Sequence, residues 1–164
     1  MCSSDLDSSK FNLIKNNLIT GIDRIAKYIV LNFKNKNRLV IHLGMTGNLR
    51  VSKFLKKVKH DHIVMNLENG NYLIYNDPRR FGLVSILANE EQFAMLDNNA
   101  DDPFSPNMTP KLLLSKIKNK NTTIKAILLN NKIISGIGNI YACEVLFRSG
   151  ISPFTLGKRS EEHT

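Results

Sequence analysis

The sequence has too few cysteines and too few long apolar runs for several classes of protein. Cys2 and Cys143 are its only cysteines, so we expect no disulfide framework and no cysteine metal site, and a reducing cytoplasm is favoured. No segment approaches the roughly 20 apolar residues of a membrane span. Tryptophan is absent, yet an apolar content of 42% is typical of a folded chain. At 164 residues, one ordinary domain or two small ones are expected.

Acidic residues are outnumbered by basic ones. The chain has 23 Lys and Arg against 14 Asp and Glu, a net charge of +9. Such a charge favours a polyanionic partner, because Lys and Arg displace the counterions of nucleic-acid phosphates, although a merely basic protein has the same composition. From Lys111 to Lys125 there are five lysines and no acidic residue. A second basic cluster consists of Arg50, Lys53, Lys56, Lys57 and Lys59.

Both ends of the chain read as translations of a common sequencing adapter in its two orientations. We therefore interpret Met1–Leu6 and Arg159–Thr164 as artefacts and exclude them from the fold prediction. On this interpretation the natural protein continues beyond both ends. Genomic sequence around the locus that encodes these same termini in a longer frame would contradict it.

The first half of the chain has the pattern of short antiparallel strands, which predicts a sandwich or a barrel. In one of these strands Ile63, Met65 and Leu67 alternate onto one face, and the following Asn69-Gly70 is a strong hairpin signal. The predicted strands are Ala26–Phe33, Arg38–Met45, His60–Leu67, Tyr72–Asn76 and Phe81–Leu87.

The second half has a helical period. A segment rich in Asn, Asp and Pro at 98–108 is typical of a linker. Thr109 and Thr123 are expected to cap two helices, the first with Pro110 at its first position, and a third helix is expected over Asn139–Arg148. The apolar stripe of the first helix is predicted to contain Leu113, Leu114 and Ile117.

The run Asn76–Gly82 lies between two predicted strands and presents two guanidinium groups and one aromatic ring. An Arg fork reads base edges, and an aromatic ring wedges into a base stack. These residues alone are equally consistent with a surface Arg pair bridged to Asp77 and with Phe81 beginning a core strand.

Four further positions each have two interpretations. The turn Gly136–Asn139 precedes a helix and either accepts a phosphate or is a simple glycine turn. Met45, between two glycines, is either an exposed void filler or a core methionine, and Lys27 is either a functional ammonium or a solvent-facing strand lysine. His60 and His62 offer two imidazoles on opposite strand faces, so we reject a metal site and favour a phosphate contact by a histidine near the lysine cluster.

In order and spacing, these motifs resemble the formamidopyrimidine-DNA glycosylase family over residues 11–156. The resemblance implies an α+β fold: a partial antiparallel β-sandwich at 7–97, the linker at 98–108, and a partial helix–two-turn–helix DNA-binding domain at 109–158. The motifs that carry it are Arg24–Tyr28, His42–Gly47, Lys59–His62, Asn76–Gly82 and Gly136–Ala142.

The resemblance also implies a function, namely base-excision repair of oxidised purines such as 8-oxoguanine by a bifunctional DNA glycosylase and AP lyase. Such enzymes flip the damaged nucleotide out of the duplex and leave a hole in the stack. Met45, Arg79 and Phe81 would fill the hole, and Arg79 would bond to the widowed cytosine. The implied partner is damaged double-stranded DNA, bound by a monomer in the bacterial cytoplasm. Positions implied to hold phosphates are Lys27, His42, His60, Lys120 and Asn139, of which Lys27 is also a candidate for assisting strand cleavage.

Two family features are absent from this sequence. The family's nucleophile is an N-terminal proline in a Pro-Glu-Leu-Pro-Glu opening, and its C-terminus is a four-cysteine zinc finger. We therefore expect an inactive internal fragment that binds no metal, from a parent protein with one zinc ion. Two alternatives remain open: an endonuclease VIII-type glycosylase for oxidised pyrimidines, and a non-catalytic DNA-binding member of the same fold.

Overall fold

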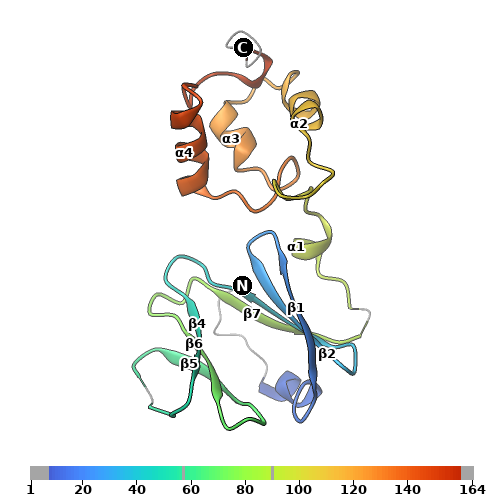
Figure 1. Cartoon of the computed structure of the whole chain (residues 1–164), viewed down its shortest axis with the longest axis vertical. Coiled ribbons are helices and arrows are strands. Elements are labelled where there is room, and N and C mark those ends of the chain that lie inside the picture. The colour runs from blue at the N-terminus through green and yellow to red at the C-terminus, as the bar shows by residue number, and fades with distance from the viewer. Residues whose placement is uncertain (1–7, 57, 90, 160–164) are drawn as a thin grey trace. The chain divides into compact units, whose positions relative to one another are not determined.

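The structure, a computed structural model, describes residues 8–56, 58–89 and 91–159. The chain divides between Gln92 and Phe93 into two compact units, each described by itself below. The first is built from strands and the second from helices (Figure 1), which confirms the predicted α+β class. The predicted boundaries at 97 and 109 stay predictions. Met1–Leu6 and all but the first residue of Arg159–Thr164 lie outside the described residues.

Two antiparallel sheets form the first unit. One has the strand order β1-β2-β3-β7 and the other β4-β6-β5. A short 3-10 helix, η2, precedes them. The elements are η2 (Ser8–Leu13), β1 (Ile19–Ile25), β2 (Tyr28–Phe33), β3 (Arg38–His42), β4 (Asn48–Ser52), β5 (Asp61–Asn66), β6 (Tyr72–Asn76) and β7 (Leu83–Leu87).

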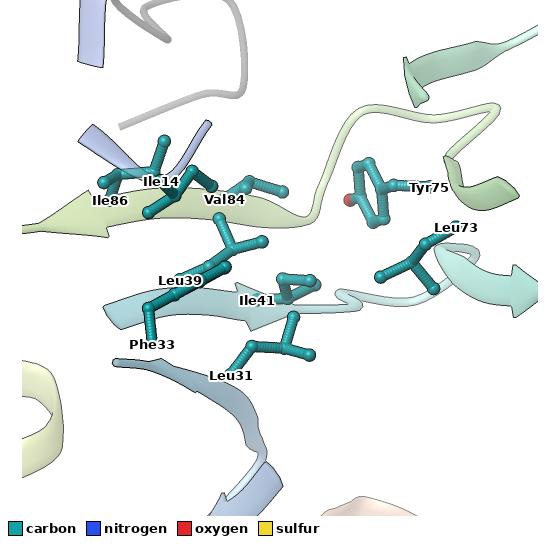
Figure 2. Close-up of a cluster of buried hydrophobic side chains, with 9 residues drawn as sticks. All are labelled: Ile14, Leu31, Phe33, Leu39, Ile41, Leu73, Tyr75, Val84 and Ile86. Carbon is teal, nitrogen blue, oxygen red and sulfur yellow. The ribbon is translucent and has the colours of Figure 1, made fainter. Parts of the chain in front are cut away.

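The core of this unit lies between the two sheets. Figure 2 shows Leu39 and Ile41 of β3 beside Leu31 of β2, with Leu73 and Tyr75 of the other sheet facing them. Ile63, Met65 and Leu67 pack against this cluster from the edge, as their alternation predicted. The first unit therefore has a rigid apolar interior from which its loops project. The buried members of the cluster are Ile14, Leu31, Phe33, Leu39, Ile41, Leu73, Tyr75, Val84 and Ile86.

Four predicted strands are shorter than their sequence pattern suggested. The predicted strand His60–Leu67 is reduced to β5, Asp61–Asn66, and the other three differ as follows. β2 begins only at Tyr28, because Ala26 takes φ +53° and forms a two-residue turn with Lys27. β3 ends at His42, because Gly44 takes φ +62° in the turn that follows. β7 begins at Leu83 rather than Phe81. All four corrections move a predicted site residue from a strand into a turn or loop.

The Asn69-Gly70 hairpin is confirmed. Gly70 takes φ +78°, the left-handed conformation that glycine adopts without strain. The amide of Leu67 donates to the carbonyl of Asn71 at 2.8 Å, and β5 pairs with β6. Neither β1 nor β4 had been predicted.

The described part of the second unit contains three helices longer than one turn, as predicted. Thr109 caps the first through its side-chain oxygen, which accepts from the amide of Leu112 at 3.1 Å, and Thr123 caps the second by accepting from Ala126 at 3.4 Å. Leu114 is 41% exposed, so it lies off the buried stripe and that prediction was wrong. No helix of the described residues is long and apolar enough to cross a membrane. The helices are α1 (Ala94–Asp97), α2 (Pro110–Ile117), α3 (Ile124–Leu128) and α4 (Asn139–Arg148).

Candidate nucleic-acid interface

Two connections of the first unit, the turn 43–47 and the loop 77–82, lie against each other at one end of the four-stranded sheet. Their strands β3 and β7 are paired neighbours, and the ladder ends with His42 opposite Leu83. The backbones then stay in contact, since a Cβ added to Gly44 would lie 2.6 Å from the carbonyl carbon of Phe81. Its positive φ and this close approach both require glycine at position 44.

The carboxylate of Asp77 holds the two connections together. It is fully buried and accepts hydrogen bonds from the Thr46 hydroxyl at 2.8 Å, the Gly82 amide at 2.8 Å, the Tyr75 hydroxyl at 3.1 Å and the Arg79 amide at 3.3 Å. Burial by itself raises the pKa of this carboxyl, but the four hydrogen bonds outweigh it, and the pKa lies below its usual value. Asp77 is therefore an anion in the folded unit at neutral pH.

Met45, Arg79 and Phe81 project from these two connections into solvent. Met45 is 73% exposed and Phe81 is 56% exposed, which is unusual for large apolar side chains. The Cζ atom of Arg79 lies 4.5 Å from the centroid of the Phe81 ring, a cation–π distance. The structure thus makes Met45 a surface residue rather than a core methionine, and it brings the predicted trio to one edge of the unit.

His42 ends β3 and stands opposite Tyr28 in the β2–β3 ladder, with the two ring centroids 5.0 Å apart. Its Nδ1 accepts the amide of Gly44 at 3.1 Å, so the ring proton is on Nε2, which is left as a donor. Partial burial, and then the charge of Lys27, lower the pKa of this imidazole. Lys27 itself is exposed in the β1–β2 turn, near enough to His42 for its charge to act on the imidazole.

His60 precedes β5 and takes φ +71°, so it is a turn residue rather than part of the predicted strand. Its carbonyl accepts the amide of Asp77 at 3.1 Å, and the Nε2–H of His62 donates to the carbonyl of Asp77 at 2.8 Å. The two imidazole centroids are 6.3 Å apart, which places the two rings near each other instead of on opposite strand faces. His60 is therefore anchored to the same loop as Arg79.

The lysine-rich loop between β4 and β5 is fixed at its end by a partly buried ion pair, in which the Asp61 carboxylate is fully buried and the Arg50 side chain is 34% exposed. Asp61 accepts from Arg50 at 2.8 Å, from the Val58 amide at 3.0 Å and from Asn76 at 2.9 Å. The hydrogen bond from the Arg50 guanidinium contributes most to holding the pKa of Asp61 well below its usual range, against the opposing effect of burial. This pair keeps His60 in register with the start of the 77–82 loop.

Lys120 and Asn139 belong to the second unit. Lys120 is exposed in the connection between α2 and α3, and its carbonyl accepts the amide of Lys158 at 3.1 Å. Asn139 is exposed at the first position of α4, directly after Gly138, where the helix has unpaired amides. Both side chains are exposed and polar, and their assignment as phosphate contacts stays a prediction.

The main residue that sequence reasoning missed is Asp77. It was considered only as an ion-pair partner for the neighbouring arginines, whereas it accepts from Thr46, Tyr75 and two backbone amides. An Asp directly before Pro is typical of a turn in which the carboxylate accepts an amide two residues on, and that local signal was present in the sequence. Thr46, 31 residues away, had no such signal.

The described residues contain no group of three or more His, Cys, Asp or Glu side chains that could hold a metal ion. Cys143, the one cysteine among them, is exposed on α4. No described residue is therefore assigned as a ligand of the zinc ion that the family resemblance implies.

Comparison with known families identifies the chain. The family model of the formamidopyrimidine-DNA glycosylase N-terminal domain matches residues 3–84, and that of the formamidopyrimidine-DNA glycosylase H2TH domain matches residues 100–164. The chain belongs to the formamidopyrimidine-DNA glycosylase family.

Curated relatives agree. The formamidopyrimidine-DNA glycosylase of Wolbachia pipientis is 40% identical over 148 residues, which are 90% of this chain and 55% of that protein. The Colwellia psychrerythraea protein of the same name is 42% identical over 147 residues, covering 88% and 54% respectively. The chain thus spans about half the length of the curated relatives it matches.

Solved structures show the same fold. The crystal structure of the MutM (Fpg) protein of Thermus thermophilus matches with a TM-score of 0.82 and 31% identity, over 93% of this chain and 56% of that one. The Lactococcus lactis formamidopyrimidine-DNA glycosylase, bound non-covalently to DNA that contains an AP site, matches with a TM-score of 0.79 and 29% identity, over 87% and 56%.

The environment of His42 leads to a titration prediction. Because Lys27 is a secondary cause of the lowered pKa, the substitution Lys27→Met is expected to raise the pKa of His42 while leaving it below about 6.5, since burial remains. The imidazole is measured by NMR titration, with Lys34→Met, in the β2–β3 turn, as the matched control.

The lowered pKa of His42 also determines the sign of a pH-dependent change in folding stability. The unfolded chain protonates His42 more readily than the folded chain does. The contribution of neutral His42 to the free energy of unfolding is therefore fully present above about pH 6.5, and it is lost as the pH falls towards the pKa of the folded state. Lys27→Met should make this loss smaller. An unchanged His42 titration in Lys27→Met, or an equal change in Lys34→Met, would contradict this electrostatic assignment.

Proposed function

We propose that the whole protein is a base-excision repair enzyme, a DNA glycosylase with AP lyase activity on oxidised purines such as 8-oxoguanine. The residues described here would bind the damaged duplex at the lesion. The observation that carries the proposal is the exposed trio Met45, Arg79 and Phe81, held on two connections by one buried carboxylate. Relatives that share this fold are named as formamidopyrimidine-DNA glycosylases, and one is bound to DNA with an AP site.

The trio suits a hole in a base stack. Met45 and Phe81 expose most of their apolar surface to water. That surface is removed from water only if an apolar partner covers it. A duplex from which one base has been flipped offers stacked base faces at the gap. Phe81 would wedge the step, and flexible Met45 would fill the irregular remainder.

Arg79 would contact the base left without a partner. Its guanidinium lies over the Phe81 ring, which restricts its orientation before binding. Cytosine presents two acceptors on its Watson–Crick edge, and a guanidinium fork supplies matching donors. A stacked arginine beside an aromatic wedge therefore favours an orphaned cytosine, the base that remains when a damaged guanine is flipped.

Phosphate contacts would come from residues around the trio. Neutral His42 offers Nε2–H as a donor, and the exposed Lys27 is near enough for its charge to act on this imidazole. His60 is anchored to the 77–82 loop, and Lys120 and Asn139 would serve the second unit. Such contacts fix the register on the duplex without reading its sequence, which suits an enzyme that scans any sequence.

The lyase chemistry is proposed for the whole protein on family grounds. A secondary amine attacks the sugar C1′ and displaces the damaged base, and opening of the sugar ring, with loss of the amine proton, gives an iminium at C1′. The iminium acidifies the neighbouring C2′–H, whose removal expels the 3′-phosphate by β-elimination. Lys27 is proposed to assist strand cleavage, and no described residue is assigned as the nucleophile. One zinc ion is proposed for the whole protein, and no described residue is assigned a role in binding it.

The binding part of the proposal is tested with one substitution. Phe81→Ala should lower the preference of the chain for a duplex with an abasic-site analogue opposite cytosine, relative to the undamaged duplex, by about 5- to 100-fold. Fluorescence anisotropy at fixed salt measures both dissociation constants. Phe104→Ala, which removes a ring that is 90% exposed in the second unit, is the matched control and should leave the preference unchanged. An unaltered preference in Phe81→Ala would reject the wedge.

The chemistry is tested with borohydride trapping of the whole protein, expressed from its gene. A covalent adduct on duplex containing 8-oxoguanine, absent with undamaged duplex or without borohydride, is the expected result. Stronger trapping on oxidised pyrimidines would favour an endonuclease VIII-type enzyme. Binding without any adduct would favour a non-catalytic member of the fold.

A further inference from the structure

The buried carboxylate of Asp77 has a role that the proposed contacts do not include. It is fully buried, whereas the trio is exposed, and it accepts hydrogen bonds from both of the connections that carry the trio. One bond, from the Thr46 hydroxyl, comes from the residue next to Met45, and two others come from the amides of Arg79 and Gly82, which flank Phe81 closely in the chain.

We propose that Asp77 is a positioning residue that couples the turn 43–47 to the loop 77–82, so that Met45, Arg79 and Phe81 enter the duplex as one preorganised unit. This inference rests on the proposed function. The coupling of the two connections is a property of the DNA-free protein and is tested separately from DNA binding.

The geometry supports a rigid coupling rather than a loose contact. Asp77 follows β6, whose Tyr75 is 2% exposed, and the Tyr75 hydroxyl donates to the same carboxylate oxygen as the Gly82 amide. The acceptor is thus fixed to the core of the sheet. Bonds to a buried carboxylate are stronger than bonds between neutral groups, because the acceptor carries a full charge in a site without water.

Packing leaves the two connections little freedom to move apart or closer. A Cβ on Gly82 would lie 2.7 Å from the carbonyl oxygen of His42, and a Cβ on Gly44 would lie 2.7 Å from the amide nitrogen of Gly82. Thr46 supplies the side-chain bond between them. Removing its hydroxyl therefore weakens the coupling without touching the trio itself.

A purely structural role for Asp77 makes a different prediction from a coupling role. If the carboxylate only stabilises its own loop, loss of the Thr46 hydroxyl disturbs the turn 43–47 and nothing else. If it couples the connections, the disturbance reaches Arg79 and Gly82, and the contributions of Met45 and Phe81 to binding depend on each other through Thr46.

The first arm of the test uses the free chain. Thr46→Val should shift the amide resonances of Arg79 and Gly82 and speed their hydrogen exchange, whereas Thr46→Ser, which keeps the hydroxyl, should restore both. Thr20→Val is the matched control, since it removes an exposed bond from the Thr20 hydroxyl to the Asn32 carbonyl at 3.3 Å. If Thr46→Val does not fold, Thr46→Ala is measured instead. Changes confined to the turn 43–47 would overturn the coupling.

The second arm is a double-mutant cycle on the abasic duplex. With Thr46 present, the double variant Met45→Ala/Phe81→Ala should lose about 3- to 10-fold less affinity than the product of the two single losses. In the Thr46→Val background the losses should multiply. Multiplicative losses in both backgrounds would overturn the proposal that the trio acts as one unit.

The two arms separate this inference from the function on which it rests. If the unaltered chain shows no preference for the abasic duplex, the binding part of the proposed function fails, and the amide measurements still decide whether Asp77 couples the connections. If the preference is present but neither arm shows coupling, the function stands and the positioning role of Asp77 is rejected.

Discussion

The buried charge of Asp77 is the constraint on which the candidate interface depends. A carboxylate without solvent contact is strongly destabilising unless hydrogen bonds replace its lost water. Here Thr46, Tyr75 and the amides of Arg79 and Gly82 supply them, and those donors come from three separate stretches of chain. Satisfying one charge therefore fixes the relative position of two exposed connections, which local turn preferences alone do not do.

The sheets supply the rigidity that this arrangement needs. β3 and β7 are paired over five residues, and their apolar side chains pack in the core with Tyr75. Exposed side chains at the end of such a ladder are held by a close-packed interior, so little ordering is required when they meet a ligand. A second carboxylate with several hydrogen bonds lies next to His60. Asp61 accepts from three donors and fixes the turn that precedes it.

Local signals in the sequence predicted much of the fold and part of the site. The caps at Thr109 and Thr123 and the hairpin at Asn69-Gly70 were predictable, because the hydrogen bonds and backbone conformations that form them involve only residues close together in the sequence. β1 and β4 were not, because both are end strands of their sheets without a buried residue: β1 lacks a clear apolar alternation, and β4 has only two apolar residues, Leu49 and Val51. The coupling of Asp77 to Thr46 spans 31 residues, and strand pairing brings the two residues together: β4 pairs with β6 up to Asn48 opposite Asn76, and β3 pairs with β7.

The most direct test of the central claim is the methyl spectrum of the chain, labelled at its five methionines, with and without DNA. Base rings shift the resonance of a methyl group that lies against them. If the trio fills the gap in the stack, an abasic duplex shifts the Met45 methyl strongly, an undamaged duplex does not, and Met65 and Met108, which pack against the two cores, stay unchanged. A Met45 resonance that is unmoved, or that moves equally with both duplexes, would contradict the claim.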